Sequence, residues 1–259
     1  MDELIFLGTG DSMGVPRVYC DCEICQEART TGVNRRYRSS VMLRTREGDL
    51  LIDCGPDWVA QMEHLGERFM KTALITHSHF DHIAGMPEWA DACRWTGEKG
   101  DVYGPPEVLD TICDQFPWLP RQLQFHPITA EGILFGGWTI EPHLMCHGKN
   151  GTSYAYRLTK EDMRVGYCSD AINLDPDQKR FLMNLDILIL GTNFYYEEAD
   201  FHTRSVYDMV EAMELLQEIK PRRVYFTHMG HGVDLQANYE LPNQVTLART
   251  GMQIQLDQY

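Results

Sequence analysis

Three imidazoles and a carboxylate lie within six positions of the chain, between residues 77 and 82. The segment reads Thr76-His77-Ser78-His79-Phe80-Asp81-His82 and directly follows the apolar run 72–75. Imidazole nitrogens and carboxylate oxygens are ligands for zinc, manganese and ferrous iron. In an extended segment the first two histidines point the same way, and a turn into a helix would aim Asp81 and His82 at a second ion. The spacing favours a two-metal site that hydrolyses phosphate esters over a surface loop that is merely rich in histidine.

Four further polar residues share one setting, since each follows an apolar or β-rich run. They are Asp53, His147, Asp170 and His228. Such positions lie at the C-terminal ends of strands, where loops converge on a site. Each residue taken alone would more often be an ordinary core or surface side chain.

The His-x-His-x-Asp-His segment resembles the signature of the metallo-β-lactamase fold superfamily, and the four other residues follow in the order of that family over nearly the whole chain. The resemblance implies two divalent metal ions, Mn²⁺ or Zn²⁺ with Ni²⁺ and Fe²⁺ as alternatives, and hydrolysis by a hydroxide generated at them. Asp53 would support the metal loop, and Asp81 would also orient the hydroxide. The implied ligands are His77, His79, His147 and Asp170 for one metal, and Asp81, His82, Asp170 and His228 for the other. Asp170 bridging both ions is typical of phosphodiesterases within the superfamily.

Three thiols lie within six residues, at Cys20, Cys22 and Cys25. Thiolates this close together suit a structural Zn²⁺, which needs one more ligand to complete a tetrahedron. Free cysteines and a redox pair are the alternatives. The pattern resembles the phosphoribosyl 1,2-cyclic phosphate phosphodiesterase branch, in which a histidine three residues past the last active-site histidine is the fourth ligand. His231 has that position.

His202 precedes the amphipathic stretch 205–216. The same branch has a non-ligand histidine here that donates a proton to the leaving oxygen or binds the phosphate. We expect His202 near a helix N-terminus, whose backbone amides favour an anion. A capping or exposed histidine is the alternative.

The bulk properties indicate a folded enzyme that acts on a small substrate. The chain has 259 residues and a net charge of -15, and none of its basic runs is longer than Arg35-Arg36. Polyanion binding requires clustered Lys and Arg, so we expect no nucleic acid polymer as a partner. The segment 34–40 could supply a phosphate contact, although a solvated turn is the expected role of each arginine in it. No apolar run spans a membrane and no signal peptide is evident, and the scattered cysteines suit a cytoplasmic protein.

The elements expected to position these residues alternate between strand and helix. Strands are predicted at 4–7, 41–43, 50–52, 73–75, 102–104, 139–142, 153–158, 164–167, 187–190, 223–226, 244–247 and 254–256, and helices at 57–65, 85–95, 107–115 and from 202. With no linker or repeat, the chain is predicted to be one hydrolase domain, 1–259. Its fold class would be α/β, an αβ/βα four-layer sandwich of two mixed β-sheets flanked by helices.

The predicted function is hydrolysis of a small cyclic phosphate to a phosphomonoester. The resemblance implies 5-phosphoribosyl 1,2-cyclic phosphate and a place in phosphonate metabolism, while a 2′,3′-cyclic nucleotide would use the same chemistry. A ribonuclease Z-like tRNA endonuclease is one alternative, against which no basic, glycine-rich arm occurs between residues 167 and 202. Thiolester, lactone or lactam hydrolysis on the same fold is another, and a scaffold protein without activity is a third. The resemblance also suggests a homodimer.

Overall fold

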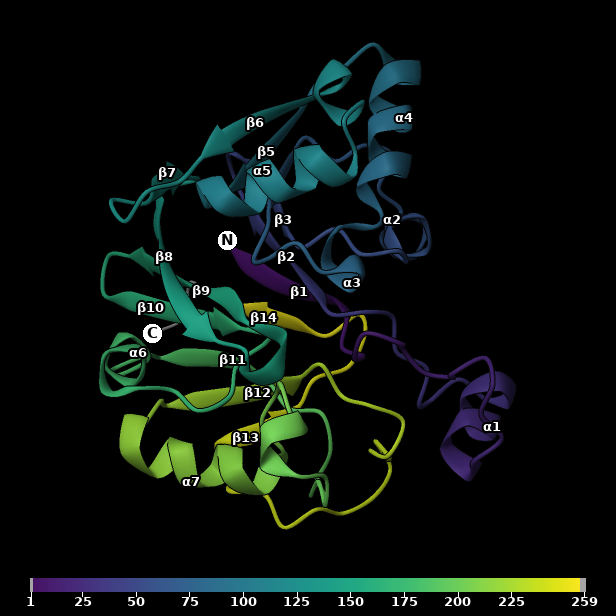
Figure 1. Ribbon diagram of the computed structural model, residues 1–259, viewed down its shortest axis with the longest axis vertical. Coiled ribbons are helices and arrows are strands. Elements are labelled where there is room, and N and C mark those ends of the chain that lie inside the picture. The colour runs from purple at the N-terminus through teal and green to yellow at the C-terminus, as the bar shows by residue number, and fades with distance from the viewer. Residues whose placement is uncertain (1, 257–259) are drawn as a thin grey trace.

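Two seven-stranded mixed sheets pack face to face in the computed structural model, which describes residues 2–256 (Figure 1). The first sheet has the order β14-β1-β2-β3-β4-β5-β6. Its strands are β1 (Glu3–Gly8), β2 (Ser40–Thr45), β3 (Gly48–Ile52), β4 (Thr72–Leu74), β5 (Gly100–Gly104), β6 (Leu123–Pro127) and β14 (Gln253–Gln255). Strands β3 to β6 run parallel, so their carboxyl ends lie along one edge.

The second sheet has the order β13-β12-β11-β10-β9-β8-β7, with β10 to β13 parallel. Its strands are β7 (Ile133–Phe135), β8 (Trp138–Cys146), β9 (Thr152–Lys160), β10 (Met163–Cys168), β11 (Ile187–Gly191), β12 (Arg223–Thr227) and β13 (Val245–Leu247). The chain crosses from the first sheet to the second between β6 and β7 and returns through β14.

Most of the helices cover the outer faces of the two sheets. They are α1 (Glu23–Thr30), α2 (Trp58–Leu65), α3 (Phe80–Ile83), α4 (Met86–Thr96), α5 (Pro106–Gln115), α6 (Pro176–Phe181) and α7 (Met209–Ile219), with the short turns η1 (Leu119–Arg121), η2 (Gly148–Asn150) and η3 (Phe201–Thr203). Helix α1 projects from the side of the molecule on the segment that follows β1 (Figure 1).

Three layers of apolar side chains separate the four layers of backbone. Residues of both sheets, among them Phe6 and Ile189, fill the space between the sheets. Trp89 of α4 belongs to the layer outside the first sheet, and Leu215 of α7 to the layer outside the second. The predicted αβ/βα four-layer sandwich is therefore confirmed.

The start of α7 differs from its prediction, because the helix begins at Met209 and not near residue 202. Asp208 caps it: its carboxylate accepts a hydrogen bond from the Glu211 backbone N–H, while the Glu211 side chain accepts one from the Asp208 N–H. This reciprocal pair satisfies two N–H groups of the first turn and defines the helix start. His202 lies seven residues earlier, in η3, so the expectation that it sits at a helix N-terminus is wrong.

Helices α1 and α6 and strands β6 and β7 were not predicted. Strand β8 also extends to Cys146, beyond the predicted end at residue 142. Among the helices within residues 2–256, none has both the length and the apolar character that crossing a membrane requires.

Candidate metal centre

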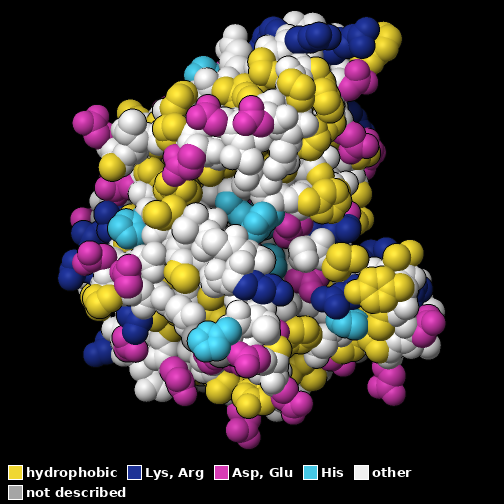
Figure 2. All heavy atoms as spheres, in the orientation of Figure 1, with side chains coloured by type: hydrophobic (Ala, Val, Ile, Leu, Met, Phe, Trp, Pro, Cys, Tyr) yellow, Lys and Arg dark blue, Asp and Glu magenta, His cyan; other side chains and the backbone are white. Residues whose placement is uncertain are grey.

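The candidate ligands come from loops at the carboxyl ends of strands in both sheets. The metal loop follows β4, and His147 follows β8. Asp170 lies two residues past β10, and His228 comes directly after β12. Histidine side chains gather at the centre of one face of the molecule, between its upper and lower halves (Figure 2).

Three of these histidines form one group. His77, His79 and His147 each offer a ring nitrogen, and these atoms lie within 4.8 Å of one another. The ring centroids of His77 and His79 are 4.5 Å apart, and the ring of His147 lies 5.2 Å from His77 and 5.1 Å from His79. His79 lies directly before α3, whereas Asp81 and His82 lie within that helix. The change from extended chain to helix therefore separates His79 from these two candidate ligands.

Asp81, His82 and His228 form a second group with the same close spacing. Both Asp81 and His82 lie in α3, as the sequence predicted. The Nε2 atom of His82 lies 3.2 Å from a carboxylate oxygen of Asp81, and Nε2 of His228 lies 3.5 Å from that same oxygen.

Asp170 lies between the two groups. One of its oxygens, Oδ1, is 3.7 Å from Nε2 of His147 and 3.2 Å from Nε2 of His228. The other, Oδ2, is 3.2 Å from Nε2 of His82. The structure thus brings together all seven residues predicted as active-site metal ligands.

Hydrogen bonds at Nδ1 fix the rings of three of these histidines, and for His77 the partner is the Thr76 hydroxyl at 3.0 Å. Nδ1 of His82 lies 2.7 Å from a carboxylate oxygen of Asp53, which also accepts hydrogen bonds from the backbone N–H and hydroxyl of Thr76. Nδ1 of His147 lies 2.8 Å from the carbonyl oxygen of Ser205. Each contact directs the opposite nitrogen, Nε2, into the site, the arrangement that metal-binding histidines commonly have.

The charges of the site are split between its two groups. Burial lowers the pKa of His77, His79 and His147, which favours neutral rings with a free lone pair. Asp170 belongs to the charged part of the site. Burial raises its pKa, but the positive charges of His228 and His82 outweigh burial and hold the pKa of Asp170 well below its usual range.

His228 shows the reverse balance. Burial lowers its pKa, but the carboxylates of Asp170 and Asp81 outweigh that effect and raise it to about 9. In the same way, Asp81, Asp53 and Asp170 overcome burial and raise the pKa of His82 well above its ordinary value.

Several buried atoms at this centre make no hydrogen bond within the part of the chain that the structure describes. They are Nε2 of His77, His82 and His228, and Oδ2 of Asp170. A buried polar atom without a partner costs about 1–3 kcal/mol, and a coordinated cation would satisfy all four of these atoms. The donor set therefore fits divalent metal ions.

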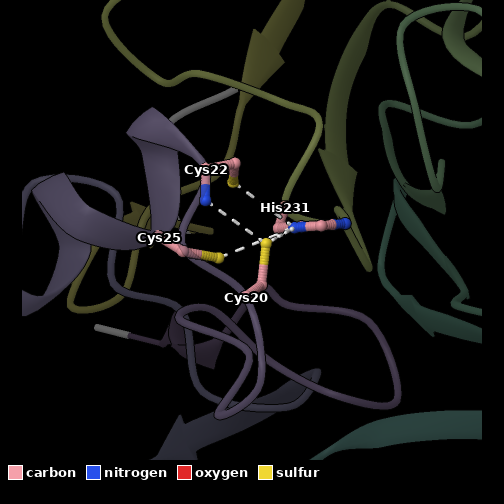
Figure 3. Close-up of side chains that lie close together, drawn as sticks. All are labelled: Cys20, Cys22, Cys25 and His231. Carbon is pink, nitrogen blue, oxygen red and sulfur yellow. Dashed lines mark hydrogen bonds between the residues drawn. The ribbon is translucent and has the colours of Figure 1, made fainter.

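The thiol cluster forms a separate site with His231 (Figure 3). Nδ1 of His231 lies 3.3 Å from the sulfur of Cys20 and 3.6 Å from those of Cys22 and Cys25. A tetrahedral zinc with bonds of about 2.3 Å to sulfur and about 2.0–2.1 Å to nitrogen separates these atoms by about 3.6 Å. The observed distances thus fit a zinc ion. Cys25 comes from α1 and His231 from the loop after β12, so such an ion would join α1 to the loop of His228.

Two of the three arginines of segment 34–40, Arg36 and Arg38, differ from their expected role as a solvated turn, whereas Arg35 is exposed. Arg36 is 2% exposed, and its guanidinium donates to the backbone carbonyls of Gly230 and Val233, beside His231. Arg38 forms an ion pair of 3.1 Å with Asp57. Both side chains are therefore structural, and Arg36 supports the loop that carries His231.

His202 is exposed and takes part in neither metal group among the described residues. Its backbone N–H donates to the carboxylate of Asp200 at 2.9 Å. Its turn, η3, contacts η2, which directly follows His147. Sequence reasoning missed two supports of the centre, the Thr76 hydroxyl and the Ser205 carbonyl, although Thr76 stands directly before the metal loop.

A four-layer αβ/βα sandwich with clustered His and Asp at its strand ends is characteristic of the metallo-β-lactamase fold. Residues 49–229 match the family model described as the beta-lactamase superfamily domain, and the chain belongs to that family, the metallo-β-lactamase superfamily.

Individual proteins extend the likeness over the whole chain. A solved structure of a diphosphatase from the PhnP family superimposes with a TM-score of 0.87 at 26% identity, covering 99% of this chain and 98% of that one. Zinc-bound PqqB from Methylobacterium extorquens has a TM-score of 0.83 at 17% identity, covering 98% and 100%, which shows a shared fold.

Two curated relatives are similar in sequence. An octanoyltransferase of Porphyromonas gingivalis is 26% identical over 98% of this chain and 51% of its own length. A ribonuclease Z of Crocosphaera subtropica is 30% identical over 62% of this chain and 48% of its own. The chain thus spans about half the length of these relatives.

Proposed function

We propose that this protein is a metal-dependent phosphodiesterase that hydrolyses a small phosphate diester, with a cyclic ribosyl phosphate as the favoured substrate. The observation that carries the proposal is the position of Asp170, which lies within 3.7 Å of ring nitrogens from both histidine groups. A shared carboxylate holds two ions close together, and two close ions suit in-line displacement at phosphorus. The diphosphatase and ribonuclease Z among the similar proteins also support phosphate chemistry.

The residues would divide into the two predicted ligand sets. His77, His79 and His147, with Asp170, would hold one ion. Asp81, His82 and His228, with Asp170 again, would hold the other. When bound, such ions lower the pKa of water to near neutrality and accept negative charge from phosphoryl oxygens.

The protein's own groups would orient the reactants. Asp81 lies in α3 beside His82 and His228. Burial raises its pKa, but the charge of His82 and the nearby ring of His228 lower it more, so Asp81 stays ionised. It can therefore accept a hydrogen bond from the attacking nucleophile and direct its lone pair toward phosphorus. Asp53 holds the His82 ring throughout.

His202 is proposed to assist the leaving oxygen or to bind the phosphate. Its exposure allows it to meet a substrate, and the contact between η3 and η2 keeps its turn beside His147. A proton donor of this kind contributes roughly 100- to 10,000-fold in rate.

A structural Zn²⁺ on Cys20, Cys22, Cys25 and His231 is part of the proposal. The four ligand atoms already converge on one point (Figure 3). Because His231 lies three residues past His228, a zinc ion there would restrain the loop that carries the active-site ligand.

A small substrate is favoured over tRNA by the net charge of -15, since phosphate-backbone binding rests on clustered cations. Two arginines that could have met a phosphate, Arg36 and Arg38, are occupied by backbone carbonyls and by Asp57. No observation at this centre favours acyl transfer, the activity named for the Porphyromonas gingivalis relative.

The test is hydrolysis of a substrate panel by the manganese-loaded protein, with Asp170→Ala as the matched inactive control. The panel holds phosphoribosyl 1,2-cyclic phosphate, a 2′,3′-cyclic nucleotide, bis(p-nitrophenyl) phosphate, a thiolester and a precursor tRNA. We expect turnover of the cyclic phosphates that the control lacks. Cleavage of the tRNA or thiolester alone would overturn the substrate class while keeping the metal centre.

A further inference from the structure

Arg204 is a buried cation at the centre of a cluster of charges next to the proposed metal centre. Its side chain is 5% exposed and meets three carboxylates. The guanidinium binds Glu211 through two parallel hydrogen bonds of 2.7 Å, contacts Glu197 at 3.1 Å through Nε, and lies 3.4 Å from Asp208. Arg204 thereby ties both ends of the segment 197–208 to the first turn of α7.

The backbone around Arg204 reaches the metal centre. The carbonyl oxygen of Arg204 accepts a hydrogen bond of 3.2 Å from the Lys149 N–H, and the next carbonyl, of Ser205, faces Nδ1 of His147 at 2.8 Å. Gly148 packs so closely that an added Cβ would lie 2.3 Å from the Arg204 carbonyl oxygen. Contacts with Gly148, Lys149 and His147 therefore fix the position of the backbone at residues 204–205.

We infer that Arg204 is a positioning residue, which fixes the Ser205 carbonyl on His147 so that His147 keeps its proton on Nδ1 and presents Nε2 to the metal. This inference rests on the proposed function of the centre. A carbonyl placed on Nδ1 selects that tautomer, because a carbonyl accepts a hydrogen bond and cannot donate one. The same clamp holds η3, and with it His202, against η2.

The planar fork of arginine is essential to this role. Two parallel bonds to Glu211 fix the orientation of the guanidinium, and Nε remains to reach Glu197. A lysine would keep the charge but could not form both contacts in one plane. Charge alone therefore does not replace the arginine.

The test compares Arg204→Met with wild type in the metal-free protein, by nitrogen-15 NMR of labelled histidines. His147 is assigned from the signal lost in His147→Gln. Wild type should show a protonated Nδ1 and an unprotonated Nε2, and Arg204→Met should show a mixture of both tautomers. Manganese titration of the folded variant should then show about 10- to 100-fold weaker binding of one ion, the usual effect of losing such support.

Arg180→Met is the matched control, since Arg180 also pairs with a carboxylate, Asp177, but its side chain is 71% exposed. It should leave tautomer and affinity unchanged. If Arg204→Met melts at a lower temperature yet keeps the Nδ1 tautomer and wild-type affinity, Arg204 is only a stabilising residue and the inference is overturned.

Should Arg204→Met fail to fold, Arg204→Lys replaces it, and a mixed tautomer is again expected. A lysine variant identical to wild type in both measurements would also overturn the inference. The tautomer is read without metal or substrate, so this result is separate from a failure of the proposed function, which would appear as wild-type protein that binds no active-site metal.

Discussion

Metal affinity at this centre should depend steeply on pH above neutrality, a range in which histidines of ordinary pKa are already deprotonated. His228 has a pKa of about 9 in the metal-free protein. Burial lowers this pKa, but the carboxylates of Asp170 and Asp81 raise it by more. A histidine must lose its proton before it can coordinate a metal. At pH 7, two units below that pKa, protonation of His228 alone weakens binding about 100-fold, or about 3 kcal/mol.

Because the pKa of His228 is raised, metal affinity should increase as the pH rises. As the pH rises from 7 toward 9, the imidazolium of His228 is lost and apparent affinity increases by about tenfold per unit. His82 acts in the same direction, since its pKa is also raised. The Nδ1–H of His82 donates to the Asp53 carboxylate and keeps its proton, so only the proton on Nε2 has to leave. We therefore expect at least about a 20-fold gain in affinity between pH 7.0 and 8.5.

The assay is competition between the EDTA-treated protein and a fluorescent chelator for Mn²⁺, at half-unit steps of pH. The control is a proton NMR titration of His228 in the metal-free protein, assigned with His228→Gln. Affinity that changes less than threefold over this range, or a His228 resonance that titrates near pH 6.5, would refute the reasoning about the buried carboxylates.

Three substitutions test the other roles. Asp170→Ala should lose both active-site ions and turnover together; a variant that keeps two ions by elemental analysis contradicts the bridging role. Cys22→Ser should lose about one zinc per chain and lower the melting temperature by about 4 °C, as loss of ~2 kcal/mol would; unchanged zinc content argues against the structural site. His202→Ala should reduce kcat by roughly 100- to 10,000-fold with metal content intact, and near-normal kcat would remove His202 from the chemistry.

The ligand loops could be predicted because their chemistry is local. The spacing from His77 to His82 determines which side chains share a face once a strand passes into a helix, and the structure has that change at α3. Asp170 and His228 follow the apolar strands β10 and β12, which both pair in parallel with β11. Parallel strands bring their carboxyl ends to one edge, so residues distant in sequence meet there.

What could not be predicted depends on contacts distant in sequence or on the backbone itself. Arg36 looked like part of a polar turn, but its guanidinium meets carbonyls almost 200 residues away, at Gly230 and Val233. The Ser205 carbonyl that faces His147 is a backbone group, for which no side-chain pattern exists. The start of α7 was misplaced because amphipathic spacing continues upstream of its cap, Asp208.

The backbone at two strand ends connects the stability of this protein to its chemistry. Asp53 and His228 both have left-handed backbone conformations, with φ of 64° and 57°. Residues other than glycine adopt this region at a cost of roughly 1–3 kcal/mol, and they keep it only when the surroundings determine the conformation. At Asp53 those surroundings are Thr76 and His82, which bind its carboxylate.

His228 has no such hydrogen bonds within the described chain, since both of its ring nitrogens lack one. Its conformation is held by its neighbours along the loop, where the Met229 N–H donates to Thr9 and the Gly230 N–H to Asn193. The His231 site lies just beyond. Metal at the active centre would supply the partner that the His228 ring lacks, and zinc at His231 would hold the loop that maintains the strained backbone. The two proposed sites would therefore stabilise the same loop from opposite ends, which would account for their separation of only three residues.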